Sequence, residues 1–139
     1  MVTPSPHGRW RVLVVDDDQD IHPLIEVMFE IEGHFEVVGH AEEGAEALEM
    51  AERLRPDAVV LDLSMPAGLD GWEALPRLRS LLPDARIVVL SNFPELVTLV
   101  QVLTAGGDAY LNKASAWELV PVLVQLLGNG SRRPVGSAC

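Results

Sequence analysis

Short apolar runs alternate along this chain with longer stretches in which apolar residues return every three or four positions. The short runs are rich in Val, Leu and Ile, which is typical of strands buried on both faces of a sheet. The longer stretches place their apolar residues along one face of a helix. Five strands are predicted, at Val12–Val15, Phe35–Val38, Ala58–Leu61, Ile87–Leu90 and Ala109–Leu111.

The helices are predicted in the intervals that follow each strand. They are expected at Ile21–Phe29, Gly44–Leu54, Trp72–Leu81, Pro94–Ala105 and Ser115 to about Leu127. Ser115 is the expected cap of the last helix, because serine favours that position. Pro94 stands near a helix start, where no hydrogen bond is lost, whereas Pro76 strains its helix. Because strand–helix alternation implies right-handed crossovers, the pattern predicts an α/β fold with a five-stranded parallel sheet covered on both faces.

The periodic part of the chain, residues 10–127, is expected to form a single domain. Its length suits the usual domain size of roughly 100–150 residues and allows a substantial core. Residues 1–9, which include two prolines, are predicted to form a flexible arm. Residues 128–139 lack periodicity and are predicted to form a flexible tail or the stub of a linker.

Composition narrows the choice of partner and compartment. The 139 residues carry a net charge of −11, from 21 acidic and 10 basic side chains. This charge argues against direct contact with nucleic acid or an anionic membrane, because both are polyanions. No apolar run approaches the roughly 20 residues of a membrane span. The first residues lack the basic and apolar regions of a secretory signal, so no such signal is expected. A single cysteine, Cys139, supports neither a disulfide framework nor a zinc site, so a cytoplasmic protein is expected.

Acidic residues gather where the predicted strands end. Asp16, Asp17 and Asp18 follow the first strand, and Asp62 follows the third. In parallel α/β sheets the chemistry lies at the carboxyl ends of the strands. Carboxylates brought together there repel one another, and Mg²⁺ is the natural counterion because it prefers oxygen ligands. The alternative, that the segment from Asp16 to Asp20 only caps the first helix, stays open at this point.

Lys113 stands just past the fifth strand and is the only lysine, since the other nine basic residues are arginines. A lysine ammonium is a compact point charge that reaches a phosphoryl oxygen, whereas arginine presents a planar fork. An ordinary surface lysine is the alternative. The place of Lys113 at a strand end, opposite a group of carboxylates, favours a functional role.

Four segments together resemble the receiver domains of two-component response regulators. They are Val14–Asp18, Pro56–Pro66, Val88–Ser91 and Ala109–Lys113. The resemblance extends from Arg11 to Leu127. It implies a (βα)5 doubly wound, flavodoxin-like fold with strand order 2-1-3-4-5.

The resemblance assigns the phosphoryl acceptor and its metal site. It makes Asp62 the acceptor of a phosphoryl group from a sensor histidine kinase or a phosphotransfer protein. Mg²⁺ would be held by Asp16, Asp17 and Asp62, with the backbone carbonyl of Ser64. These roles agree with the chemistry, since phosphoryl transfer needs charge neutralisation and positioning more than covalent work by the protein.

The resemblance also assigns the groups that respond to phosphorylation. Ser91 and Lys113 would contact the phosphoryl group, and Tyr110 would be an aromatic switch. No glycine-rich phosphate loop is present, so the chain is expected to receive phosphoryl groups without binding ATP. Beyond transfer to its own aspartate and slow loss of the phosphoryl group, no enzymatic activity is expected.

Three features depart from the usual receiver pattern. The segment from Met65 to Gly71 has one extra residue, which is expected to alter kinase docking or access to the acceptor. Asn92 and its neighbour Phe93 crowd the same entrance, so these two and Met65 are candidate access-modulating residues. Ala114 follows the lysine where many receivers have proline, which excludes a cis Lys–Pro bond.

Two other classes of function remain as alternatives. A haloacid-dehalogenase-like phosphatase would also place two carboxylates after a strand, but Asp20 stands where that family has Thr or Val. A degenerate receiver that binds partners without phosphorylation is the second alternative. Its expected signature is loss of Asp17, Asp62 or Lys113, and all three are present. Whether the chain stands alone or is part of a longer regulator with an output domain stays open.

The last predicted helix points to an interaction surface. Eighteen of the 21 acidic residues lie at or before Asp84. Trp117, Pro121 and Val124 fall on the side of the last helix opposite its expected core face, and an exposed apolar patch marks an interaction site. The fourth helix, fifth strand and fifth helix are therefore expected to contact a downstream protein or a second copy of the chain. The alternative is that the C-terminal tail folds over this patch.

Overall fold

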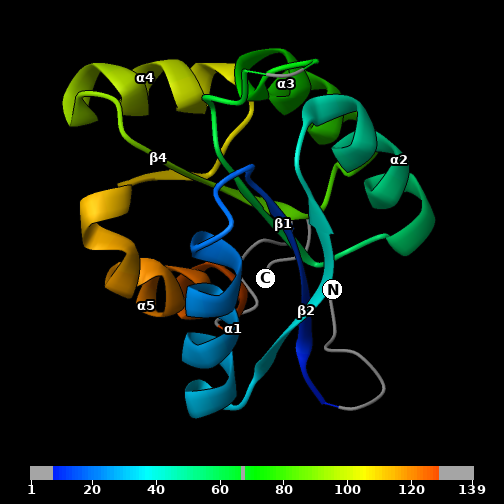
Figure 1. Cartoon of the computed structure of the whole chain (residues 1–139), viewed down its shortest axis with the longest axis vertical. Coiled ribbons are helices and arrows are strands. Elements are labelled where there is room, and N and C mark those ends of the chain that lie inside the picture. Colours follow the sequence, from blue (N-terminus) through cyan, green and yellow to red (C-terminus); the bar gives the residue numbers. More distant parts are fainter. Residues whose placement is uncertain (1–7, 67, 129–139) are drawn as a thin grey trace, which may run out of the picture.

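A central sheet of five parallel strands organises the protein, as seen in a computed structural model that describes residues 8–66 and 68–128 (Figure 1). The strands are β1 (Trp10–Val15), β2 (Phe35–Ala41), β3 (Ala58–Leu61), β4 (Arg86–Ser91) and β5 (Ala109–Asn112). Their spatial order is 2-1-3-4-5, and every neighbouring pair is parallel. The predicted α/β class and the strand order implied by the resemblance are both confirmed.

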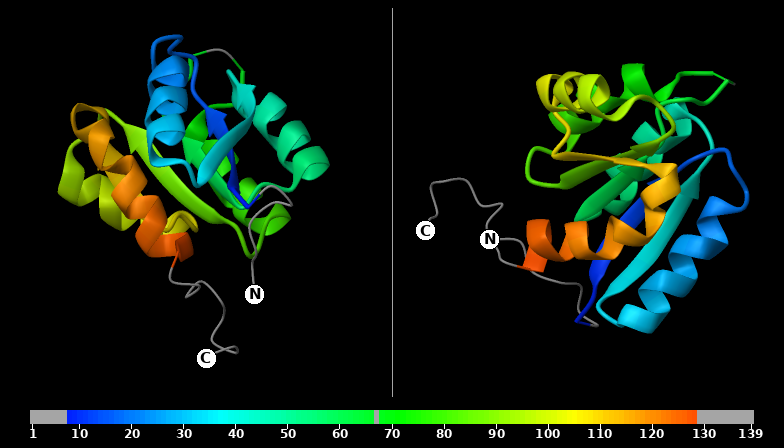
Figure 2. Two further views of the ribbon diagram at one scale, coloured as in Figure 1. Left: turned by 90° about the horizontal axis from the view of Figure 1, so that it is seen from below. Right: turned by 90° about the vertical axis from the view of Figure 1, so that its left-hand side faces the viewer.

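Helices cover both faces of the sheet, two on one side and three on the other (Figures 1 and 2). They are α1 (Ile21–Glu32), α2 (Gly44–Leu54), α3 (Gly71–Leu81), α4 (Glu95–Ala105) and α5 (Leu119–Leu123). Helices α1 and α5 pack on one face, and α2, α3 and α4 pack on the other. A 3₁₀ segment at Lys113–Glu118 precedes α5, and a π-helical turn at Val124–Gly128 follows it.

Alternation of side chains along the strands divides the core into two layers. Val12 and Val14 of β1 point toward α1 and α5, whereas Leu13 and Val15 point toward α2, α3 and α4. All four are fully buried, which explains why the strand is apolar at consecutive positions. The two buried layers hold the carboxyl ends of the strands at one edge of the molecule.

Helix α3 begins directly against the end of β3. The Asp70 carboxylate accepts a hydrogen bond from the Glu73 N–H, and the Glu73 side chain accepts one from the Asp70 N–H, which forms a capping box. The next residue, Gly71, is packed so tightly that a Cβ atom there would overlap the carbonyl oxygen of Asp62. Glycine at this position therefore lets the helix start beside the backbone of Asp62.

The expected cap of the last helix at Ser115 is wrong. The carboxamide oxygen of Asn112 accepts the Ala114 N–H at 2.9 Å, and the helical segment begins at Lys113. Ser115 has a non-helical backbone (φ −113°, ψ 30°) inside that segment. Asparagine and serine are comparably good caps, and the strand ends one residue later than expected. The cap consequently lies three residues earlier in the chain.

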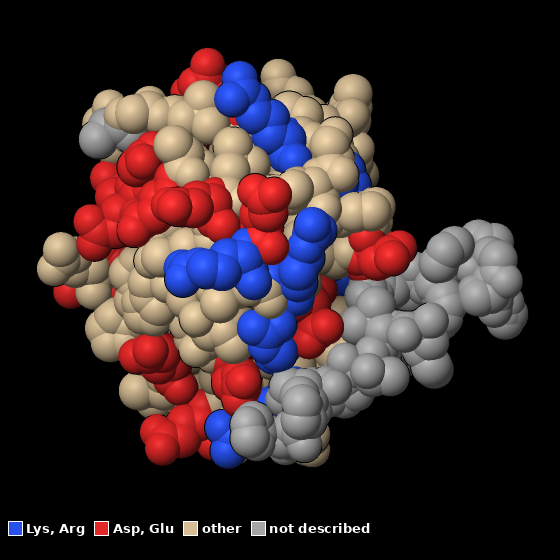
Figure 3. All heavy atoms as spheres, turned by 90° about the vertical axis from the view of Figure 1, so that its right-hand side faces the viewer, with Lys and Arg blue, Asp and Glu red and all other residues tan. Residues whose placement is uncertain are grey.

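The side of the molecule on which α2 lies is strongly charged. Acidic and arginine side chains are interspersed there (Figure 3). Two of the arginines bind backbone carbonyls at helix ends: Arg55 Nη1 donates to Leu81, and Arg79 donates to Gly106 and Leu82. Since carbonyls at helix C-termini lack intrahelical donors, these arginines stabilise the ends of α3 and α4.

The predicted arm and tail lie largely outside the described residues. Only Gly8 and Arg9 of the arm are described, and residues 129–139, with Cys139, are not. Across the two described ranges, no helix has both the length and the apolar composition that crossing a bilayer requires.

Candidate functional site

Three carboxylates converge where β1 and β3 end. Asp16, Asp17 and Asp62 each offer an oxygen, and these oxygens lie within 4.8 Å of one another. The Asp62 N–H donates to the Val15 carbonyl at 2.9 Å, so the two strand ends are held side by side. Asp16 and Asp62 are 2% and 3% exposed, whereas Asp17 is open to solvent. The sequence-predicted acidic cluster is therefore assembled by the fold.

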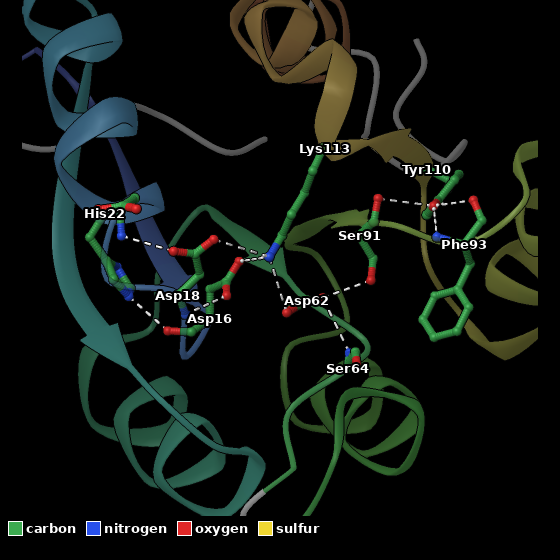
Figure 4. A network of polar contacts seen from close by, with 10 residues as sticks. Asp16, Asp18, His22, Asp62, Ser64, Ser91, Phe93, Tyr110 and Lys113 are labelled. Atoms are coloured by element: carbon green, nitrogen blue, oxygen red, sulfur yellow. Dashed lines mark hydrogen bonds and ion pairs between the residues drawn. The ribbon is translucent and has the colours of Figure 1, made fainter.

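Lys113 lies between the two buried carboxylates (Figure 4). Its Nζ is 2.9 Å from Asp16 Oδ2, 3.3 Å from Asp62 Oδ2 and 3.9 Å from Asp18 Oδ2. Burial acts to lower the pKa of Lys113, but the hydrogen bonds and charges of Asp16 and Asp62 together outweigh it and raise the pKa above its ordinary value. The ammonium group is thus positively charged and partly offsets the repulsion between the buried acids.

Asp16 is harder to ionise than an ordinary aspartate. Burial raises the pKa of Asp16 to about 6, and the nearby charge of Asp62 acts in the same direction. The Asp18 N–H and Lys113 oppose this increase by stabilising the charged form. A divalent cation would complete the compensation that Lys113 begins.

Both oxygens of Asp62 have polar neighbours from different elements. Oδ1 accepts the Ser91 hydroxyl at 2.7 Å and the Ser64 N–H at 3.2 Å. Oδ2 faces Lys113. The Ser91 side chain is buried at the end of β4, so its hydroxyl is aimed at Asp62 by the strand itself. The predicted acceptor therefore contacts both the predicted hydroxyl and the predicted lysine.

Tyr110 ties β5 to the loop that follows β4 (Figure 4). Its hydroxyl lies 2.8 Å from the Phe93 carbonyl and 3.1 Å from the Ser91 carbonyl, and it accepts the Phe93 N–H at 2.9 Å. Burial raises the pKa of Tyr110, so the hydroxyl keeps its proton and donates it to this loop. Movement of the tyrosine would require the loop to find other hydrogen-bond partners.

The three candidate access-modulating residues lie in different environments. Asn92 is exposed, and Phe93 is half-buried with its ring centroid 6.2 Å from that of Trp72. Met65 is 3% exposed and packs within the core, so its side chain is not at the surface. In the lengthened loop, Gly68 has φ +71°, a conformation that favours glycine. The influence of these residues on access stays a prediction.

The predicted interface residues are all on the surface. Trp117, Pro121 and Val124 are exposed on the helical segment Lys113–Gly128, which comprises the 3₁₀ segment, α5 and the π-helical turn. The sequence interpretation did not name the apolar side chains that α4 exposes. These are Leu96, Val97, Val100 and Leu103.

Sequence reasoning also missed two histidines beside the acidic cluster. His22 Nε2 lies 2.8 Å from the Asp16 carbonyl oxygen, and the His22 ring stacks on His40 with ring centroids 4.3 Å apart. The only available signal was that His22 follows the acidic segment within a helical turn. Nothing in the sequence placed His40, which belongs to β2, against it.

The donor set fits a hard divalent cation. Every candidate ligand at the cluster is a carboxylate oxygen, the type that Mg²⁺ and Ca²⁺ prefer. Asp17 is open to solvent, which suits a cation that keeps several of its waters. The Ser64 N–H lies against Asp62, so its backbone is adjacent to the cluster, while metal binding by the Ser64 carbonyl stays a prediction.

Comparison with known proteins finds a family that covers most of the chain. Residues 12–124 match the response regulator receiver domain. Response regulator MprA of Mycolicibacterium vanbaalenii is 42% identical over 108 residues, which cover 78% of this chain and 46% of MprA. MprA of Mycobacterium bovis (strain BCG / Pasteur 1173P2) is 41% identical over the same length, 78% of this chain and 46% of that protein. The chain spans about half the length of the curated relatives it matches.

Solved structures share the fold. The signal receiver domain of the putative response regulator NarL from Mycobacterium tuberculosis is 32% identical, with a TM-score of 0.76 over 85% of this chain and 95% of that chain. A LuxR-family two-component response regulator from Aurantimonas sp. SI85-9A1 is 28% identical, with a TM-score of 0.79 over 87% and 86% of the two chains. The sequence match and the strand order of the sheet point to the same family, and this chain belongs to the receiver domains of two-component response regulators.

Proposed function

We propose that this chain accepts a phosphoryl group on Asp62, with Mg²⁺, from a sensor histidine kinase or a phosphotransfer protein in the cytoplasm. The observation that carries the proposal is the environment of Asp62. This buried carboxylate is contacted by the Ser91 hydroxyl and the Lys113 ammonium and adjoins two further carboxylates. No other group in the described ranges combines a nucleophilic oxygen with this set of neighbours.

One structural relative supports the same chemistry. A response regulator from Burkholderia pseudomallei, whose structure is described as having a phosphorylated aspartic acid, a calcium ion and citrate, is 30% identical to this chain. Its TM-score is 0.73, over 88% of this chain and 69% of that chain. A phosphorylated aspartate on a similar domain favours the same modification here.

In the proposed reaction an oxygen of Asp62 attacks the phosphorus of a phosphohistidine. The new O–P bond forms as the P–N bond breaks, and the electron pair leaves with the imidazole nitrogen. Lys113 is close enough to Asp62 to pair with a phosphoryl oxygen as charge builds on it. Bound Mg²⁺ would neutralise further charge on the phosphoryl oxygens. The protein supplies position and electrostatic stabilisation, which are the main requirements of this reaction.

The proposed response to phosphorylation begins at Ser91. Its hydroxyl donates to Asp62 and would follow the phosphoryl group, while its carbonyl lies against the Tyr110 hydroxyl. A shift of Ser91 would therefore weaken the hydrogen bonds that hold the Tyr110 hydroxyl against the loop after β4. We expect this change to alter the surface of α4, β5 and α5, through which a downstream protein or a second copy would bind.

Intact-mass measurement tests the proposal. Incubation with acetyl phosphate and Mg²⁺ should add about 80 Da, the mass of one phosphoryl group, as a covalent intermediate on the nucleophile. Asp62→Asn should abolish the adduct. Asp18→Asn is the matched control and should retain it, because Asp18 lies outside the three-carboxylate cluster. An adduct retained by Asp62→Asn overturns the assignment.

The same experiment separates the alternatives. Rapid release of phosphate over many turnovers would favour a phosphatase. Unchanged mass of the wild-type chain would favour a receiver-like scaffold that is not phosphorylated.

A further inference from the structure

A buried histidine holds the backbone of the acidic loop. His22 is the second residue of α1 and is 7% exposed. Its Nε2 lies 2.8 Å from the carbonyl oxygen of Asp16. Because a carbonyl oxygen only accepts hydrogen bonds, the ring carries a proton on Nε2 and donates it. This bond spans the loop between β1 and α1, which carries Asp17.

The hydrogen-bonded carbonyl of Asp16 also affects the position of the next residue, Asp17. A peptide unit is planar, so the Asp16 carbonyl and the nitrogen and Cα of Asp17 move as one rigid group. Asp16 is also held through its N–H, which donates to the Ala41 carbonyl at 2.9 Å. In contrast, none of the hydrogen bonds or ion pairs found among residues 8–66 and 68–128 reaches the Asp17 carboxylate. The direction in which Asp17 projects therefore depends on the peptide that His22 holds.

A second histidine fixes the ring of the first. The His22 and His40 rings are stacked, with centroids 4.3 Å apart and planes inclined by 17°. His40 Nε2 lies 3.1 Å from Glu26 Oε2, and Glu26 follows His22 by one helical turn. Among the described residues, His22 Nδ1 has no hydrogen-bond partner. The orientation of the ring therefore depends on the bond to Asp16 and on the stacking with His40.

We propose that His22, held by His40, is a positioning residue that orients the Asp16–Asp17 peptide for binding of a divalent cation. The inference rests on the metal site of the proposed function and deepens it. Residues that orient metal ligands from outside the coordination sphere change metal affinity by about 10–100-fold when they are lost. The lower end, about tenfold, is expected here because His22 acts on the backbone and leaves the carboxylates in place.

The test measures Mg²⁺ binding to the full chain by calorimetry, without a phosphoryl donor. His22→Phe keeps a ring to stack on His40 but removes the donor, and we expect its Kd for Mg²⁺ to rise about tenfold. His22→Gln keeps an N–H donor without the ring and should recover most of the affinity. His40→Leu should give an intermediate loss. His34→Leu is the control and should match wild type, because His34 is exposed and contacts Glu32.

A second readout separates positioning from general damage to the fold. With acetyl phosphate, His22→Phe should need more Mg²⁺ for half-maximal labelling, while the rate at saturating Mg²⁺ stays close to wild type. Circular dichroism verifies that each variant is folded, and His22→Leu replaces His22→Phe if the larger ring does not fit. A donor-free variant that is folded and binds Mg²⁺ as tightly as wild type overturns the inference.

The outcomes distinguish this inference from the proposed function. Failure of the wild-type chain both to bind Mg²⁺ and to form the adduct would reject the function and, with it, the role of His22. If the wild-type chain binds Mg²⁺ and forms the adduct, while the donor-free variant (His22→Phe or His22→Leu) binds Mg²⁺ equally tightly, only the role of His22 is rejected.

Discussion

Asp16 combines a structural role with an acid–base equilibrium close to neutral pH. Burial raises the pKa of Asp16 to about 6 from an unfolded value of 3.8. Between these two values the native state binds more protons than the unfolded chain, so this group's contribution to stability falls as pH rises through that window. Metal binding has the opposite dependence, because only the ionised carboxylate is a ligand.

Mg²⁺ affinity should therefore increase with pH around the raised pKa of Asp16. With a pKa of about 6, the ionised fraction falls about tenfold between pH 7 and pH 5, and the affinity should fall in proportion. Calorimetric titrations across this range measure the effect. Asp16→Asn should bind more weakly and lose most of the dependence. Equal affinity of the wild-type chain at pH 5 and pH 7 would contradict this prediction.

Lys113 should stabilise the metal-free protein. Replacement by methionine, Lys113→Met, leaves Asp16 and Asp62 buried together without their cation. Loss of one partner from a buried charge cluster costs about 3 kcal/mol of unfolding free energy. Urea denaturation near pH 7.5 without Mg²⁺ measures the change. Saturating Mg²⁺, or the added substitution Asp16→Asn, should recover part of the loss; stability equal to wild type would show that Lys113 is not the counterion.

The sequence was informative about this site because of where its residues stand. Asp62, Ser91 and Lys113 each follow a predicted strand, and parallel strands bring their carboxyl ends to one edge. No such rule relates His22 on α1 to His40 on β2, because their stacking depends on how the helix packs against the sheet. Their contact is therefore a tertiary feature that only the folded arrangement shows.

At the scale of elements, the start of α3 is coupled to the backbone of Asp62. Helix α3 begins at Gly71, whose N–H donates to the Leu63 carbonyl at 3.2 Å. A side chain at this position would meet the Asp62 carbonyl oxygen and Leu63 Cα. The helix and the proposed acceptor consequently cannot move independently.

Gly71→Ala should damage both stability and labelling. Overpacking of this kind costs about 1–3 kcal/mol, and the upper end is expected because the clashing atoms belong to the backbone. Gly33→Ala is the matched control: its backbone is left-handed (φ +91°), but a Cβ there meets nothing within 4 Å. That control should lose about 1 kcal/mol of stability and keep normal acetyl phosphate labelling. Normal labelling in both variants would argue against the coupling.

Element order was predictable from the apolar pattern, whereas element ends were less so. Strand β3 and helix α2 have the predicted bounds. Strand β2 extends to Ala41, beyond the predicted Val38, because the Gly39 and His40 positions pair with β1 despite their weak strand pattern. The cap at Asn112 was missed because the 3₁₀ segment begins directly after β5, so that the last residue of the strand is also the cap. Local propensity does not determine such endings when tertiary packing sets them.

At the scale of the whole molecule, six of the nine large apolar side chains that the described residues expose lie on α4 or on the helical segment Lys113–Gly128, and the other three lie on α1. Charged side chains are abundant where α2 lies (Figure 3). Helix α4 and the helical segment Lys113–Gly128 expose a set of large apolar side chains, here called the α4–α5 surface. Its members are Leu96, Val97, Val100, Leu103, Trp117 and Val124. Exposed apolar patches of this kind mark interaction sites, which agrees with the partner surface proposed above.

The α4–α5 surface should support an association that strengthens on phosphorylation. We expect the wild-type chain to self-associate more strongly in sedimentation velocity experiments when beryllofluoride and Mg²⁺ mimic the phosphoryl group. Added salt should weaken the association little, because apolar contacts are not screened as ion pairs are. Val100→Glu and Trp117→Glu should abolish it, whereas Ile31→Glu should not, since Ile31 is 81% exposed on α1, outside this surface. A wild-type chain that stays monomeric at high concentration in both states, with unchanged partner binding by Trp117→Glu, would show that the surface is not an interface.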